Sequence, residues 1–170
     1  MKKVALFFTA LAVLSCAPKD PVRDAIEQAI ISDLAAPKTY KFVSYELARE
    51  LSPAEEATRV GLYMVKYESV QRLDGEPIAD YIARGDAALA TYNEKVAAVK
   101  ELAETMPEKV VARIYKFVYR ADIPNVGRDF PVEVFALIDT AGSCLGIGNT
   151  MKDALSIPHT SVPEFQPYTK

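Results

Sequence analysis

Cysteine and histidine, which often act as nucleophiles, general bases and metal ligands, are scarce in this 170-residue chain. The chain has two cysteines, Cys16 and Cys144, and one histidine, His159. A structural zinc site needs about four cysteine or histidine ligands, and a serine–histidine–aspartate site on His159 would require a rigidly held C-terminal tail. The sequence contains neither a nucleophile elbow nor a phosphate-binding glycine loop. We therefore expect no metal, no cofactor and no catalytic residue.

The thiol of Cys144 has two interpretations. It is either a nucleophile or redox group, or a small apolar side chain in a strand, since free cysteine is among the most buried residue types. Its neighbours, Ser143 and 145–147, include no cation that would lower the thiol pKa. The sequence favours the apolar interpretation.

Arginine and tyrosine recur in the segment 109–122, where a strand is expected. Both residue types are enriched where proteins bind partners, although they are also ordinary in sheets. Four of them could line a polar aromatic patch, and we predict that they bind a ligand or a partner: Arg113, Tyr115, Tyr119 and Arg120.

The first fifteen residues have the pattern of a secretory signal, with Lys2 and Lys3 followed by an apolar run, 4–15. The run is too short for a membrane-spanning helix, which needs about 20 residues. A signal peptide that is cut without lipidation is the alternative, but it would leave Cys16 unpaired at an exposed terminus.

The stretch Val13-Leu14-Ser15-Cys16 resembles the lipobox of bacterial lipoproteins. This resemblance implies that the signal is cut before Cys16, that the Cys16 thiol is acylated, and that residues 16–19 form a lipidated N-terminus and short spacer. Ala17 is similar to the residue found in lipoproteins sent to the outer membrane. Lys19-Asp20 partly resembles an acidic signal for surface export, so the periplasmic side and the cell surface both remain open.

Charge limits the classes of partner. Without Lys2 and Lys3, the 20 basic residues fall to 18 against 23 acidic ones, a net charge of about −5. Such a balance disfavours nucleic acid as a partner and electrostatic docking to membranes. The lipid on Cys16 would therefore have to provide the membrane attachment.

The first helix is predicted to begin after Asp20, a good N-cap residue, with Pro21 at its first position. Apolar residues then recur at steps of three and four up to Leu34, and Pro37 ends the helix. Aromatic and β-branched residues over 39–47 predict a strand.

Two more helices are expected. Ser52-Pro53-Ala54-Glu55 has the pattern of a capping box, and the helix it opens reaches about Val70, although 61–67 could also be a strand. Asp74-Gly75 predicts a turn. The segment 77–105 forms a long helix, and the two helices are expected to form an antiparallel hairpin joined by a short turn.

Apolar residues in the long helix recur every 3.5 residues on average, the period of a coiled-coil seam. Such a stripe either binds a second copy or a partner, or packs on the preceding helix and the sheet. Gly85, Tyr92 and Ala103 make the stripe irregular, which favours packing within the chain.

Three strands follow, over 109–122, about 132–139 and 143–148, linked by turns into an antiparallel meander. The tail 156–170 contains three prolines and should be extended. It is either a ligand for a partner's groove or a segment that buries Phe165 and Tyr168 on its own domain, and the second is favoured.

Together the elements predict a single α+β domain over 20–155, in which an N-terminal helix and a long antiparallel helical hairpin pack on a roughly four-stranded, mainly antiparallel sheet. Three segments resemble small lipoproteins of Bacteroidota-type envelopes with no known activity: 36–44, Tyr119-Arg120-Ala121 and 163–168. We expect an outer-membrane lipoprotein that binds an envelope protein or acts as a scaffold, and not an enzyme. The alternative is a hydrolase or transferase with a site of scattered carboxylates and tyrosines.

Overall fold

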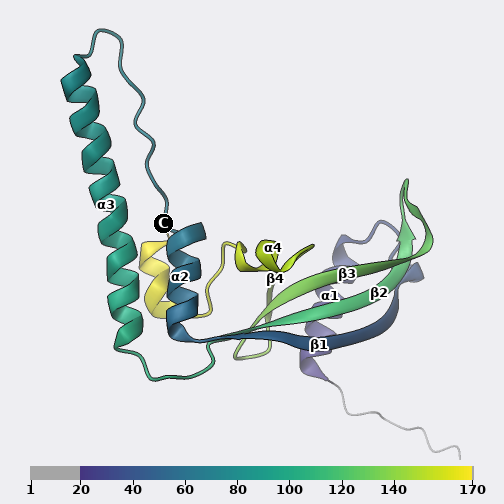
Figure 1. Cartoon of the computed structure of the whole chain (residues 1–170). Coiled ribbons are helices and arrows are strands. Elements are labelled where there is room, and N and C mark those ends of the chain that lie inside the picture. Colours follow the sequence, from purple (N-terminus) through teal and green to yellow (C-terminus); the bar gives the residue numbers. More distant parts are fainter. Residues whose placement is uncertain (1–19, 170) are drawn as a thin grey trace, which may run out of the picture.

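The computed structural model describes residues 20–169 and contains one four-stranded sheet with helices on its faces and at its end (Figure 1). The strands are β1 (Lys41–Leu51), β2 (Ala112–Ile123), β3 (Gly127–Asp139) and β4 (Cys144–Gly148), in the order β1-β2-β3-β4. Each neighbouring pair is antiparallel. The prediction of a mixed α+β fold with a four-stranded antiparallel sheet is therefore confirmed.

Helix α1 (Pro21–Asp33) lies across one face of the sheet. The Asp20 carboxylate accepts hydrogen bonds from the backbone N–H groups of Val22 and Arg23, 3.1 and 3.2 Å long, and so caps the helix start. A short 3₁₀ helix, η1 (Pro37–Thr39), leads from α1 into β1. The core under α1 consists of these residues: Ile26, Ile30, Phe117, Tyr119, Ala121, Val134, Ala136 and Ile138.

The opposite face of the sheet is covered in part by α4 (Met151–Leu155), which the sequence analysis did not predict. Thr150 and Asp153 form a capping box at its start. Side chains alternate along a strand, so Leu137 of β3 is buried on this face whereas Ala136 and Ile138 are buried under α1. The buried residues on this face are Leu51, Ala112, Ile114, Leu137, Ala154 and Ile157.

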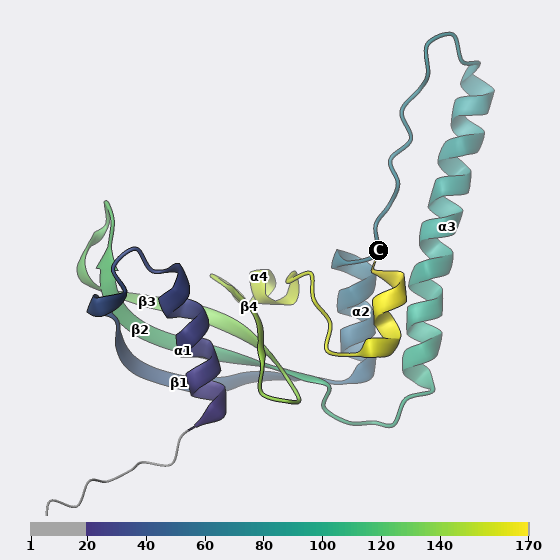
Figure 2. The same ribbon diagram turned by 180° about the vertical axis from the view of Figure 1, so that it is seen from behind.

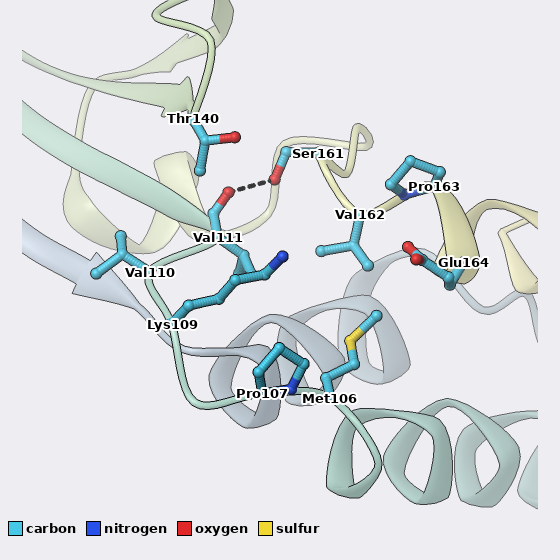
Figure 3. Close-up of a pocket in the computed structure, with 10 residues that line it drawn as sticks. All are labelled: Met106, Pro107, Lys109, Val110, Val111, Thr140, Ser161, Val162, Pro163 and Glu164. Atoms are coloured by element: carbon cyan, nitrogen blue, oxygen red, sulfur yellow. Dashed lines mark hydrogen bonds between the residues drawn. The ribbon is translucent and has the colours of Figure 1, made fainter.

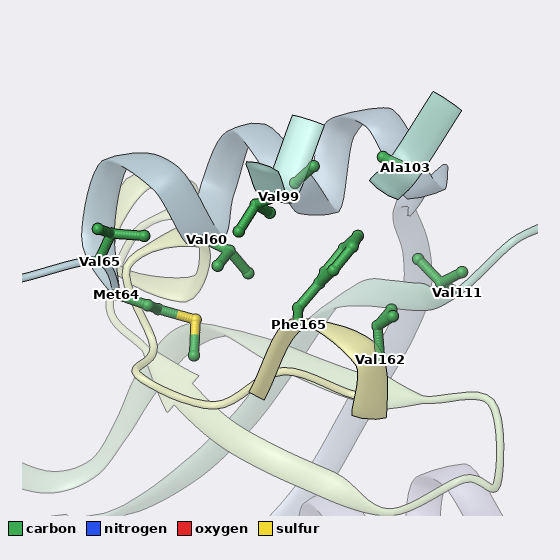
Figure 4. Packing of buried hydrophobic residues seen from close by; sticks show 9 residues of the cluster. Val60, Met64, Val65, Val99, Ala103, Val111, Val162 and Phe165 are labelled. Atoms are coloured by element: carbon green, nitrogen blue, oxygen red, sulfur yellow. The ribbon is translucent and has the colours of Figure 1, made fainter. Parts of the chain in front are cut away.

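A separate helical lobe stands at the end of the sheet (Figures 1 and 2). It consists of α2 (Pro53–Tyr63), the long helix α3 (Ile78–Glu104) and the 3₁₀ helix η2 (Pro163–Tyr168). Phe165 is fully buried between α2 and α3 (Figure 4). The other buried residues of this core are Ala57, Val60, Met64, Val65, Val99, Ala103, Val111 and Val162.

The position of this lobe differs from the expected hairpin across a sheet face. β1 continues directly into α2 through the Ser52 capping box, and α3 leads into β2 through 105–111. Both helices therefore leave the sheet at its end, while α1 and α4 occupy its faces. The lobe has its own core, which includes no residue of the four strands.

The connection between the two long helices also differs from the expectation. α2 ends at Tyr63, and residues 66–73 run extended beside α3 before the turn at Asp74-Gly75, after which α3 begins (Figure 1). Gly75 has φ +76°, which glycine adopts without strain. The predicted turn exists, but a long extended segment precedes it in place of a helix.

The sequence predicted an extended tail over 156–170, but the structure has a 3₁₀ helix in its second half. Pro163 opens η2, because the fixed φ of proline suits the first position of a helical turn. The turn places Phe165 in the core of the lobe, and burial of a phenylalanine side chain stabilises this conformation by about 2 kcal/mol.

Candidate functional site

The predicted patch on β2 is divided between the two faces of the sheet. Tyr115 and Tyr119 pack in the core under α1, and Arg113 follows the same alternation. Arg120 lies on the other face, because it comes seven positions after Arg113 and an odd step along a strand changes the face. The four residues therefore do not form one surface.

Each of these four side chains has a partner within the chain, and that of Tyr115 is the ring of Tyr45, with centroids 5.7 Å apart. Arg113 pairs with Glu50 at 2.9 Å, and Arg120 pairs with Asp129 at 3.0 Å. The rings of Tyr119 and Tyr40 have centroids 5.6 Å apart, and burial raises the pKa of Tyr119. These contacts explain the residues as components of the sheet.

Of the cysteines and the histidine, only Cys144 and His159 lie in the described structure. Cys16, the predicted lipidation site, lies outside the described residues. Burial raises the pKa of the half-buried Cys144 thiol, which keeps it protonated and weakly nucleophilic. The side chain of His159 is exposed on the segment between α4 and η2.

Among residues 20–169, four carboxyl groups have lowered pKa values, and in each case the main cause is a neighbour that donates a hydrogen bond to the ionised form. The donors are Tyr45 for Asp20, Arg49 for Glu55, Arg84 for Glu76 and Lys41 for Asp129. A general acid needs a raised pKa. These carboxylates are instead held in the charged form by capping and ion pairs.

The most buried charges in the described structure are Glu56 and Arg59, on the inner face of α2. Arg59 donates two hydrogen bonds to the Glu56 carboxylate, each 2.8 Å long. It also donates to the backbone carbonyls of Leu155, Ile157 and His159. The Thr160 hydroxyl donates to Glu56 at 2.6 Å.

This cluster clamps 155–160 against α2, and we assign it a structural role. Sequence analysis did not single out Glu56 or Arg59. The available signal was their spacing: Glu56 and Arg59 are three residues apart, which allows an ion pair on a helix, and each is next to a buried apolar residue, Ala57 or Val60.

The helical lobe and the sheet meet at a surface cavity of about 440 Å³ (Figure 3). Its apolar wall combines the buried Val111 and Val162 with Met106 and Pro107. The Ser161 hydroxyl donates to the Val111 carbonyl at 2.6 Å and fixes the rear of the cavity. The remaining lining residues are Lys109, Val110, Thr140, Pro163 and Glu164.

Two opposite charges face this cavity. Figure 3 shows the Lys109 ammonium and the Glu164 carboxylate pointing toward one another across the cavity. Within residues 20–169, neither takes part in an ion pair. Sequence alone does not predict that Lys109 and Glu164 line one cavity, because 55 positions separate the two residues and only the fold brings them there.

A second candidate surface lies on the part of the lobe that projects away from the sheet. We call residues 66–91 the arm; it comprises the extended segment 66–77 and the first half of α3. Ile78, Ile82 and Leu89 lie on one face of α3 and are 62%, 53% and 47% exposed. We call these three residues the arm stripe.

The arm stripe continues the face by which α3 contacts α2. Further along α3, Val99 and Ala103 are buried in the core of the lobe, and Tyr92 donates a hydrogen bond to the Gly61 carbonyl at 3.2 Å. Because α2 ends at Tyr63, it does not reach the first half of α3, where the arm stripe lies. Packing within the chain therefore accounts for only the second half of the predicted seam.

Other features of the described chain give no further guide to chemistry. No helix within residues 20–169 is both long and apolar enough to cross a membrane. The same part of the chain contains no cluster of three or more histidine, cysteine, aspartate or glutamate side chains that could bind a metal ion. The chain matches no protein-family model, no curated protein and no solved structure.

Proposed function

We propose that this protein is an outer-membrane lipoprotein, held by acyl chains on Cys16, whose arm binds another protein of the envelope. We take α2, residues 64–77 and α3 together as the helical hairpin that presents this surface. The role is that of a binding or scaffold module, without catalysis.

The observation that carries the proposal is the exposure of the arm stripe. Large apolar side chains that gather on one face of a projecting helix are typical of a protein-binding surface. Further exposed apolar side chains lie on the arm or at its base: Leu62, Tyr63, Tyr67 and Leu73. Their burial by a partner would remove this surface from water.

The position of the arm suits attachment through Cys16. α1 begins at the lower end of both views, whereas the tip of the arm is at the upper end (Figures 1 and 2). Asp20 is held by the hydroxyl of Tyr45 as well as by its capping contacts. Only residues 17–19 separate it from Cys16, a reach of roughly 10–14 Å. A lipid at Cys16 would hold the body near the membrane and leave the arm accessible.

The alternative, a hydrolase or transferase built from scattered carboxylates and tyrosines, has no observation in its favour. The carboxyl groups with shifted pKa values are charged partners of capping and ion-pair contacts. The tyrosines of β2 are components of the core.

Site-specific crosslinking in intact envelopes tests the proposal. A photoreactive side chain at Asp86, exposed and close to Ile82 on α3, should form an adduct with one defined protein. The adduct should disappear when Ile82 and Leu89 are both changed to Glu, because buried unpaired charges oppose the contact.

The matched control is Val126→Glu, at an exposed apolar residue of the turn between β2 and β3. This variant should retain the adduct at Asp86. Persistence of the adduct in the Ile82→Glu, Leu89→Glu variant, or no adduct at all, would contradict the role assigned to the arm.

A further inference from the structure

The cavity between the lobe and the sheet presents two charges of opposite sign over an apolar wall, as described above. Its volume, about 440 Å³, lies in the range of small-molecule sites. Val111 and Val162, which form the wall, are buried in the core of the lobe, so the wall is held in place by packing.

The charges restrict the ligand. An anion that approached Lys109 would also meet the carboxylate of Glu164, and a cation bound to Glu164 would meet the ammonium of Lys109. A ligand that carries both charges, one at each end, satisfies both side chains at once. Charge-assisted hydrogen bonds to each would fix its orientation.

We propose that this cavity binds a small zwitterion, with its primary ammonium on Glu164, its phosphate or carboxylate on Lys109, and apolar atoms against Val111 and Val162. Two sources share this chemistry: the phosphoethanolamine headgroup of a membrane lipid, and a free apolar amino acid.

The headgroup as source rests on the proposed membrane attachment. The segment 105–111 and the turn between β3 and β4, both of which line the cavity, lie toward the same end of the molecule as the start of α1 (Figures 1 and 2). A bilayer that holds Cys16 would then be near the cavity. The free amino acid requires no membrane.

Titration of the full-length protein, purified from envelopes in a neutral detergent, tests the site. The probes are phosphoethanolamine, leucine and phosphocholine. Phosphocholine has the same phosphate but a quaternary ammonium, which cannot donate a hydrogen bond to Glu164. We expect phosphoethanolamine or leucine to bind about tenfold more tightly than phosphocholine.

Variants distinguish the two charges. Glu164→Gln should abolish the preference over phosphocholine, and Lys109→Gln should weaken binding of all three probes about tenfold. Exchange of the charges in the double variant Lys109→Glu, Glu164→Lys should restore binding, because the ligand can reverse. Lys152→Gln, on α4 and outside the cavity lining, is the control and should change nothing.

Vesicles identify the source. Phosphatidylcholine vesicles that contain phosphatidylethanolamine should retain the protein more than pure phosphatidylcholine vesicles if the headgroup is bound, and leucine should compete if the amino acid is bound. Soluble-probe binding that is unchanged in the Cys16→Ser protein separates this site from the membrane proposal. Equal, weak binding of all probes by the wild type and both single variants, or a double variant no better than the single ones, would overturn the zwitterion site.

Discussion

Arg59 and Glu56 form two parallel hydrogen bonds, each 2.8 Å long, in the interior of the helical lobe, where neither side chain is accessible to solvent. The remaining donors of Arg59 bind backbone carbonyls of 155–159, so the pair joins α2 to the segment that leads into η2. The pair therefore fixes the chain just before η2, which carries Phe165 into the core of the lobe.

Replacement of Arg59 by Met should lower the free energy of unfolding by about 3–5 kcal/mol, because it leaves the Glu56 carboxylate buried without a counter-ion. Urea denaturation would measure this. The control is Arg49→Met, which removes an exposed pair with Glu55 and should cost less than about 1 kcal/mol. Similar costs for the two variants would show that the buried pair is not a clamp.

Two glycines should respond in opposite directions to alanine. A Cβ at Gly148 would lie 2.7 Å from the backbone carbonyl carbon of Asp153, so Gly148→Ala should destabilise the fold by about 2 kcal/mol or more. A Cβ at Gly85, within α3, would meet no atom within 4 Å, so Gly85→Ala should stabilise it by about 1 kcal/mol. Thermal unfolding of both variants gives the signs, and a loss of stability in Gly85→Ala would contradict the environment described for α3.

The Tyr45–Asp20 hydrogen bond predicts a pH-dependent contribution to stability. It lowers the pKa of Asp20 below 3.8, so its contribution is present above that pH and is lost as the pH falls through the lowered value. It raises the pKa of Tyr45 from 10.0 to about 12, so the contribution is also lost as the pH rises through that interval.

Tyr45→Phe should therefore cost about 1 kcal/mol near neutral pH, a modest value because the pair is accessible to water. Urea unfolding of both proteins across the pH range should show the difference shrink below about pH 4 and above about pH 10. If the difference in unfolding free energy between the two proteins stayed constant from acid to alkaline pH, the cost of Tyr45→Phe would come from packing alone and not from the hydrogen bond.

Sequence patterns predicted local structure well where the determinants are local. The Ser52 capping box forms, and the strand expected over 109–122 is present as β2, in which Phe117 and Tyr119 share one buried face. The end of α2 was missed because Tyr67, which seemed to continue the apolar face of the helix, instead contacts Tyr92 from an extended segment. Periodicity cannot distinguish these two conformations.

Features that depend on contacts between distant segments could not be predicted. The clamp on Arg59 uses carbonyls about 100 positions away in the sequence, and the cavity brings together Lys109 and Glu164. The predicted patch on β2 grouped Arg113 and Arg120 by residue type, although alternation along the strand places them on opposite faces.

The two halves of α3 should differ in their sensitivity to substitution. Val99→Ala should cost about 2 kcal/mol, since it leaves a space in the core of the lobe. Ile82→Ser and Leu89→Ser should each change stability by less than about 0.5 kcal/mol, because both side chains are exposed. Chemical denaturation provides the comparison. A large loss of stability in either serine variant would mean that the arm stripe supports the fold and is not free for a partner.

Acylation of Cys16 is tested most directly by growing cells with an alkyne-tagged fatty acid and determining the mass of the N-terminal peptide of the purified protein. We predict that the wild-type protein incorporates the label on a peptide that begins at Cys16, and that Cys16→Ser incorporates none. A wild-type protein that is released in soluble form, with an unlabelled and unmodified N-terminus, would contradict membrane attachment and with it the proposed function.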